Sequence, residues 1–352
     1  MLKYCLLAAI LAISGHALAA RTDASPALVG SRPMSVMAPK RGKKIHVRLW
    51  YPAATGGKPG LIGATKVFKG VAASSDAPMA TGVFPLVLLA HGGLRAAPGL
   101  GNWIAADLAR KGYVVTLVHA PLPNELSARG AVRELWLRPG DLSAALTSVM
   151  RTPKLARHLQ HGAIGVVGFL RGGTSALALA GARLDVRRYR HSCDKPRTSA
   201  DCRWFAHNKV DLRTADIDQA FRSFLDKRIK TAVVVDPELS GYFTPKSLSS
   251  IGIPVELIRL GSGSGSATVP GFDAAALLNS VPDIHHDIVK HATAFSSFSL
   301  CTARASRFLR AAPGSEPICG EGNEARSRMH ARIAGLIEAS LQRTLPLPHR
   351  GK

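Results

Sequence analysis

Apolar runs alternate with helical patterns along most of the chain. Five short runs are apolar at nearly every position, which is typical of strands buried on both faces of a parallel sheet; they lie at residues 84–90, 113–119, 163–169, 231–235 and 255–260. Helical patterns fall between or after them, at residues 103–111, 143–150 (the end of a helix) and 174–182. A weaker strand pattern at residues 285–289 and an amphipathic closing helix at residues 324–342 follow. This alternation predicts an α/β fold with a mostly parallel central sheet and helices on both faces.

Three stretches depart from the alternation. Residues 34–38 and 45–51 flank the polar turn PKRGKK and predict an antiparallel hairpin. Residues 53–81 are rich in Gly, Ala and Ser, and no element is assigned to them. Residues 183–230 turn polar, as expected of a lid-like insertion over the top of the sheet. With no internal repeat and no long linker, residues 20–352 are predicted to form one domain.

The chain is organised around residues 164–182, IGVVGFLRGGTSALALAGA, which predict a strand, a sharp turn and a helix. Gly168 and Gly172 are the outer positions of the pattern G-x-S-x-G, in which a serine nucleophile stands at the apex of a strained turn called the elbow. Gly173 follows directly. The apex here is Leu170, which has neither a lone pair nor an acidic proton. The sequence predicts the elbow of a serine hydrolase without its nucleophile.

The N-terminus has the three parts of a secretory signal peptide. Lys3 precedes an apolar run over residues 4–14, and residues 17–19 match the small-residue A-x-A cleavage pattern. A buried helix would share the apolar run but not the basic start and the cleavage pattern. Residues 1–19 are therefore predicted to be removed on export, which would leave a periplasmic or secreted protein without a transmembrane segment.

Removal of the signal would leave four cysteines, an even number that suits two disulfides in an oxidising compartment. Three pairings are open. We expect Cys193 with Cys202 and Cys301 with Cys319, because each of these pairs closes a short local loop. The alternative, a zinc site, lacks C-x-x-C spacing and histidines at ligand spacing. We expect neither a metal site nor a cofactor.

The chain is strongly basic, with a formal net charge of +23 over 352 residues. Arg and Lys are most concentrated between residues 183 and 230. An exported protein seldom meets nucleic acid, so no nucleic-acid partner is expected. Two interpretations of the charge remain: a solvated surface, or attraction to anionic polymers or lipid headgroups of the cell envelope, which salt would weaken.

The order of these motifs resembles the secreted bacterial α/β-hydrolases called dienelactone hydrolase-like, which are similar to the platelet-activating-factor acetylhydrolases. The resemblance covers nearly the whole mature chain and is carried by VGSRPMSVMAPKRGKKIHVRLWYPA, FPLVLLAHGG, VVGFLRGGTSALALAGA, VVVDPELSGYFTP and ATAFSSFSLC. It implies an α/β-hydrolase fold and carboxylic-ester hydrolysis. It also implies a triad of the elbow serine, an aspartate after the next core strand and a histidine near the C-terminal end.

The family's aspartate is matched by Asp236, which follows the apolar strand at residues 231–235. A carboxylate buried there needs a partner, because its desolvation is costly. The alternative is that Asp236 caps the turn before Pro237. The GSGSGS run at residues 261–266 occupies a loop where many α/β-hydrolases carry their acid, and it has none. Asp236 is therefore the predicted acid.

The oxyanion loop is matched by the run from His91 to Gly93, after the strand at residues 84–90. The resemblance implies that the N–H groups of Gly93 and Arg171 would face a developing negative oxygen. His91 itself is interpreted as a packing and hydrogen-bonding residue of that loop.

The family's histidine is not matched. When Cys301 is aligned with the family's cysteine, the place of the histidine falls on Ala294, and a methyl group cannot accept a proton. A shifted loop could bring in His291, or else His285 or His286, as a substitute base. A substitute nucleophile is not evident, because the side chain of Ser175 would point away from the oxyanion donors.

Three functions remain open on these grounds. The first is a catalytically degenerate hydrolase that keeps a binding or scaffold role, with a small ester or lipid-like molecule as its ligand. The second is a carboxylic-ester hydrolase that uses a non-standard catalytic group. The third is a basic protein that binds the anionic envelope surface. Loss of two triad positions favours the first.

Overall fold

A computed structural model describes residues 28–122, 125–194, 199–261, 269–309, 318–345 and 347. The predicted signal peptide lies outside the described residues, and so does most of the GSGSGS run.

Ten strands of the described residues form one sheet, in the order β10-β9-β8-β7-β5-β6-β2-β1-β4-β3. Their bounds are β1 Leu28–Ala38, β2 Lys43–Ala53, β3 Lys58–Ile62, β4 Val71–Ser75, β5 Phe84–Ala90, β6 Val114–Val118, β7 Leu159–Phe169, β8 Thr231–Val235, β9 Val255–Leu260 and β10 Ile284–Val289. The strands from β10 to β6 pair in parallel, whereas β2 is antiparallel to both β6 and β1. The predicted mostly parallel sheet and the N-terminal hairpin are confirmed.

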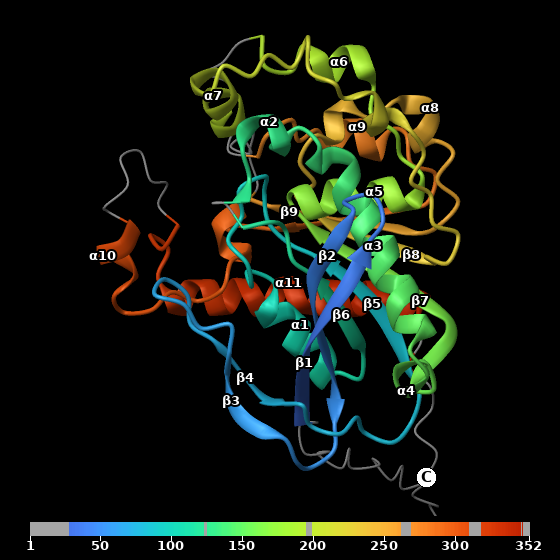
Figure 1. The fold of residues 1–352 in the computed structure, drawn as a ribbon, viewed down its shortest axis with the longest axis vertical. Helices are drawn as coiled ribbons and strands as arrows, with labels where there is room; N and C mark the ends of the chain where they lie inside the picture. Colours follow the sequence, from blue (N-terminus) through green and yellow to red (C-terminus); the bar gives the residue numbers. More distant parts are fainter. Residues whose placement is uncertain are drawn as a thin grey trace, which may run out of the picture.

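Helices cover both faces of this sheet (Figure 1). The α-helices are α1 Asn102–Arg110, α2 Ala128–Ala131, α3 Glu134–Arg151, α4 Pro153–Ala156, α5 Arg171–Ala180, α6 Val186–Arg190, α7 Ala200–His207, α8 Pro245–Leu248, α9 Ala274–Leu278, α10 Ala305–Leu309 and α11 Asn323–Thr344. Short 3-10 helices are η3 Asp218–Phe221, η4 Ser240–Tyr242 and η6 Ala294–Ser297. The apolar sides of α3 and α5 pack on one face, and those of α1 and α11 on the other. The core is thus divided into two layers by the sheet.

Two departures from the predicted elements have physical reasons. The stretch at residues 53–81 contains β3 and β4, an antiparallel pair at the edge of the sheet. KPGLI is exposed and VAASS is mostly half-buried, so neither has the apolar run of a strand buried on both faces. Helix α5 begins at Arg171 rather than at residue 174, because its first turn holds two glycines that give no helical pattern.

The polar segment at residues 183–230 forms α6, α7 and η3, and Figure 1 shows α6 and α7 at the top of the molecule. Disulfides join Cys193 to Cys202 within this segment and Cys301 to Cys319 near the C-terminus, which is the pairing expected from the sequence. Among the described residues, no helix combines the length and the apolar character needed to cross a membrane.

Candidate active site

The turn between β7 and α5 has the backbone of an elbow. Leu170 stands at its apex with φ 55° and ψ −120°, a conformation that costs an ordinary residue about 1–3 kcal/mol. Leu170 N donates to Val235 O at 3.0 Å, and Glu238 N and Thr174 N donate to Leu170 O at 3.1 and 3.2 Å. The strained turn is therefore tied to the end of β8 and to the chain that follows it.

Glycines allow the backbones to meet at this turn. A Cβ on Gly168 would lie 2.3 Å from Gly172 O, and one on Gly172 would lie 2.1 Å from Ala90 O at the end of β5. Both distances are far below van der Waals contact, so no side chain fits at either position. A Cβ on Gly173 would likewise lie 2.9 Å from the Cβ of Pro237. All three predicted elbow glycines thus serve close packing of strand, helix and neighbouring loops.

A cavity of about 280 Å³ lies beside the elbow. Loops after β5, β7 and β8 contribute Gly93, Leu170 and Glu238, and η6 contributes Ala294. Asp201 of α7 also lines it, so the polar segment at residues 183–230 contributes to the lining of this cavity. Most of the remaining lining is apolar. The carboxyl ends of neighbouring parallel strands thus converge on one small, mostly apolar space.

The structure brings the apex of the elbow and the unmatched histidine position together. Leu170 and Ala294 pack with Val269 in one small apolar cluster, and both are more than nine-tenths buried. Phe272 and Phe298 pack against its edge. None of these side chains can donate or accept a proton. Ala294, at which the resemblance would place the histidine, thus belongs to the same apolar cluster as the apex residue.

Asp236 directly follows β8 and is buried, with a left-handed backbone at φ 42°. Its Oδ1 accepts a hydrogen bond from Leu260 N at 3.1 Å. Burial raises the pKa of this carboxyl to about 7, against the smaller lowering effects of that hydrogen bond and of the Arg259 charge. No histidine of the described residues is hydrogen-bonded to it. Asp236 is thus a buried acid without the imidazole that a triad requires.

The proposed substitutes are not at the cavity. His291 is exposed in the turn after β10, and His285 and His286 are exposed on β10. None of the three lines the cavity. Ser175 is buried in α5, where its hydroxyl donates to Arg171 O at 3.2 Å, and it does not line the cavity either. Within the described residues, no hydroxyl–imidazole pair faces the elbow.

The oxyanion loop is held by a buried arginine that sequence reasoning missed. Arg138 of α3 donates to Gly93 O at 3.0 Å and to Leu94 O at 2.9 Å. Its Nε donates to Glu134 at 3.2 Å, and Glu134 also pairs with Arg41 of the β1–β2 turn at 2.7 Å. This network fixes the loop by its carbonyl groups, so the backbone conformation at Gly93 does not depend on a catalytic serine.

His91 is a packing residue, as its place in the loop suggested. Its ring stacks on Phe169 with centroids 4.5 Å apart, and its Nε2 lies 2.8 Å from Ser297 O. Burial lowers the pKa of His91 to about 3, so the ring is neutral near pH 7 and donates to that carbonyl. Trp103 Nε1 donates to the same oxygen at 2.8 Å. These bonds anchor the segment that carries Ala294.

The side chain of Arg171 forms a charged group that the sequence did not predict. Its Nε donates to Glu238 Oε2 at 2.7 Å, and its Nη2 donates to Asp201 Oδ2 at 3.0 Å. Burial alone would lower the pKa of Arg171, but the two carboxylates raise it, so the guanidinium stays charged. The pKa of Glu238 is raised by burial, although Arg171 opposes this effect. The one clue in the sequence was an arginine inside the glycine-rich elbow.

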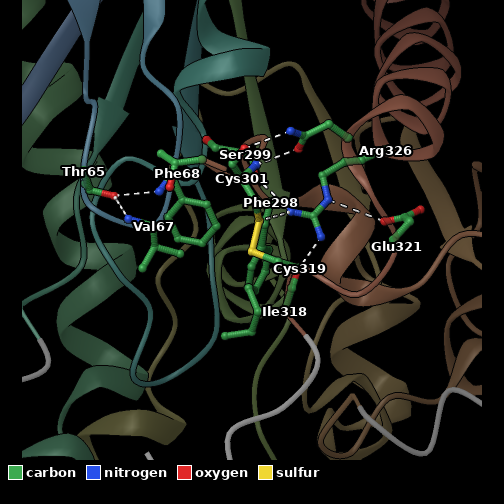
Figure 2. The surroundings of a disulfide bond; sticks show 12 residues. Thr65, Val67, Phe68, Phe298, Ser299, Cys301, Ile318, Cys319, Glu321 and Arg326 are labelled. Carbon is green, nitrogen blue, oxygen red and sulfur yellow. Dashed lines mark hydrogen bonds and ion pairs between the residues drawn. A yellow bond between two sulfur atoms is a disulfide. The ribbon is translucent and has the colours of Figure 1, made fainter. Parts of the chain in front are cut away.

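Figure 2 shows the surroundings of the second disulfide, where three of the residues that line the cavity are found. Phe68 and Phe298, two lining residues, pack edge to face with ring centroids 6.4 Å apart beside Cys301–Cys319. On the other side, the buried Arg326 donates to Ser299 O at 3.0 Å and also to Ile318 O. Ile318, which precedes Cys319, lines the cavity as well.

Among the described residues, no three His, Cys, Asp or Glu side chains gather as a metal ion would require.

Comparison with known proteins gives a structural likeness only. No protein-family model and no curated protein matches this chain. A solved ferulic acid esterase from Streptomyces cinnamoneus is similar, with 17% sequence identity and a TM-score of 0.59 over 92% of this chain and 91% of that chain. A dienelactone hydrolase from Anabaena variabilis matches at 15% identity and a TM-score of 0.49 over 90% of this chain and 98% of that chain, a likeness too weak to carry an argument. At these identities the comparison establishes the fold, and the chain has the fold of the α/β-hydrolases.

Proposed function

We propose that this protein is a catalytically degenerate hydrolase of the dienelactone hydrolase-like family that acts by binding a small, largely apolar molecule. The observation that carries the proposal is the cluster of Leu170, Ala294 and Val269 beside the elbow. Ester hydrolysis by this type of site needs a nucleophile at the apex and a base within hydrogen-bond reach. Both places hold hydrocarbon, while the cavity remains open to a ligand.

The position of Glu238 supports the proposal independently. A Cβ built on Gly93 would lie 2.8 Å from Glu238 Oε1, so this carboxylate lies against the loop that would donate to an oxyanion. A negative oxygen that developed there would be repelled by the ionised carboxylate in a poorly solvated space. The site therefore departs from a working esterase in electrostatics as well as in its triad.

Turnover of a chromogenic aryl acetate tests the proposal. We expect the purified protein to hydrolyse it no faster than the matched variant Leu170→Gly, in which glycine tolerates the apex conformation and only the leucine side chain is lost. The variant His291→Ala should also leave the rate unchanged. Turnover by the native chain that survives purification and disappears in His291→Ala would overturn the proposal, and would make the protein an ester hydrolase with a non-standard base.

We further propose that the protein is exported and that its basic surface meets anionic material in the envelope. Two disulfides support export, because such bonds persist in oxidising compartments. Arg183, Arg187 and Arg188 are exposed on the segment at residues 183–230, which supports the electrostatic contact. Binding to vesicles rich in anionic lipid should then fall steeply between low and physiological salt. Binding that is insensitive to salt would contradict this contact.

A further inference from the structure

We propose that the cavity recognises an apolar primary amine in its ammonium form, with Glu238 Oε1 as the acceptor of the ammonium hydrogens. This inference rests on the binding role proposed above and names the chemistry of the ligand. It follows from three features of the cavity: the net charge of one buried group, an oxygen atom without a donor, and an apolar remainder.

The buried charged group consists of Arg171, Glu238 and Asp201. One guanidinium bridges two carboxylates and engages one oxygen of each, Glu238 Oε2 and Asp201 Oδ2. With all three ionised, the group carries one net negative charge. The side chain of Arg171 is 4% exposed and that of Glu238 is 5% exposed, so solvent screens this charge poorly. A bound cation would neutralise it.

Glu238 Oε1 has no hydrogen-bond donor among the described residues, whereas Oε2 is held by Arg171. Glu238 lines the cavity, and Oε1 lies against Gly93, which lines it too. Oε1 is accessible from the cavity, where an acceptor that lacks a protein donor is available to a ligand. A ligand N–H at this point would donate to it. A ligand carboxylate or ester oxygen would instead place a second acceptor against Oε1, with no hydrogen between the two oxygens.

The neighbouring cations of the described residues are engaged by other groups, although the Arg138 charge still lowers the pKa of Glu238. Arg138 uses its guanidinium on Glu134 and on the carbonyls of Gly93 and Leu94. Arg95 lines the cavity but is exposed, and its guanidinium lies over the Trp204 ring, 4.9 Å from the centroid. Glu238 and Asp201 are therefore the carboxylates that line the cavity, although the protein as a whole is strongly basic.

The rest of the cavity suits a short hydrocarbon chain. Leu94, Leu170, Val269, Phe295, Phe298 and Ile318 supply apolar or aromatic surface. The volume of about 280 Å³ is just below the usual range for ligand pockets, which is about 300–1,000 Å³. Aromatic rings also attract an ammonium group near their faces. The combination points to a small amphiphile with a cationic, N–H-bearing head.

Calorimetric titration with three probes of equal chain length tests the inference: n-octylamine, n-octanol and sodium octanoate at pH 8. We expect octylamine to bind at least about tenfold more tightly than octanol, equivalent to about 1.4 kcal/mol, and octanoate to bind more weakly than both. Glu238→Gln should remove most of the preference for the amine. The matched control Glu324→Gln, at an exposed position on α11, should leave it unchanged. Asp201→Asn, which neutralises the group without altering Oε1, should reduce the preference several-fold.

The outcomes separate this inference from the proposed function. Equal binding of octylamine and octanol would overturn ammonium recognition and leave the apolar binding role standing. Failure of all three probes to bind would overturn the binding role together with this inference. A preference for the amine that persists in both Glu238→Gln and Asp201→Asn would overturn the assignment to these carboxylates. Thermal unfolding of each variant identifies any that fails to fold, and the remaining variant then decides.

Discussion

The backbone of the elbow and the side chains around it contrast sharply. Gly168, Gly172 and the left-handed apex at residue 170 keep the geometry that presents a nucleophile. The side chains that such a nucleophile would need are replaced by Leu170 and Ala294. The contrast has a physical origin: the glycines are enclosed by the backbone of β5 and β7, whereas the two side chains border a cavity that tolerates changes of size and polarity. Packing can therefore preserve the frame of a catalytic site after its chemistry is lost.

The largest effect is expected where the frame is altered. In Gly172→Ala the new Cβ would lie 2.1 Å from Ala90 O, and neither backbone can move without disturbing the sheet. We expect a loss of at least about 3 kcal/mol in the free energy of unfolding, or a chain that does not fold. Gly335→Ala is the control: it meets nothing within 4 Å in α11 and should stabilise the protein by up to about 1 kcal/mol. Urea denaturation that shows equal stability for both variants would contradict this view of the frame.

The second largest loss of stability is expected when the disulfide beside the cavity is removed. Replacing both Cys301 and Cys319 by serine removes a bond across 18 residues. Because this bond restricts the unfolded chain, its loss should lower the free energy of unfolding by about 3 kcal/mol. The matching change at Cys193 and Cys202 removes a bond across only 9 residues and should cost less. Urea denaturation of the two double variants compares them directly. A larger loss from the pair Cys193 and Cys202 would show that native-state packing, rather than loop length, dominates.

Asp236 gives a smaller, pH-dependent effect. Burial raises its pKa from the ordinary 3.8 of an aspartate to about 7, so the folded state holds the proton more tightly than the unfolded chain does. The contribution of Asp236 to the free energy of unfolding is therefore fully present below about pH 4 and is lost as the pH rises toward 7. Asp236→Asn keeps an acceptor for Leu260 N and avoids the buried charge. It should stabilise the protein at pH 8 by about 1–4 kcal/mol and have no effect at pH 3.5. Equal unfolding midpoints at pH 8 would show that Asp236 is charged at little cost.

The smallest change is expected at the apex itself. Leu170→Gly relieves a strained conformation worth about 1–3 kcal/mol but removes apolar contacts of similar worth with Val269 and Ala294. The unfolding free energy should move by less than about 1 kcal/mol. A loss as large as that of Gly172→Ala would show that the leucine, and not only the frame, holds the elbow together.

The sequence predicted the buried strands and the elbow because both leave strong local patterns. Mostly apolar runs without alternation marked β5, β6, β7, β8 and β9, and the spaced glycines marked the turn. It did not reveal β3 and β4, which are short edge strands without an extended apolar run. It also missed the group of Arg171, Glu238 and Asp201. Asp201 lies 30 positions and Glu238 67 positions after Arg171, so the three meet only after the chain has folded. The roles of Asp236 and of the oxyanion loop remain predictions.

Turnover of a short-chain aryl ester by four proteins tests the central claim most directly: the native chain, Leu170→Ser, Ala294→His and the double variant. If the frame is intact and only the catalytic groups are missing, each single variant should stay near background, because a serine without a base and a base without a nucleophile are both ineffective. The double variant, with Asp236 to orient the new histidine, should exceed the product of the single effects by at least about tenfold. Repeating the cycle with Glu238→Gln should raise this rate further by removing the negative charge beside Gly93. A double variant no faster than that product in either background, or a native chain already as fast as the double variant, would contradict the account.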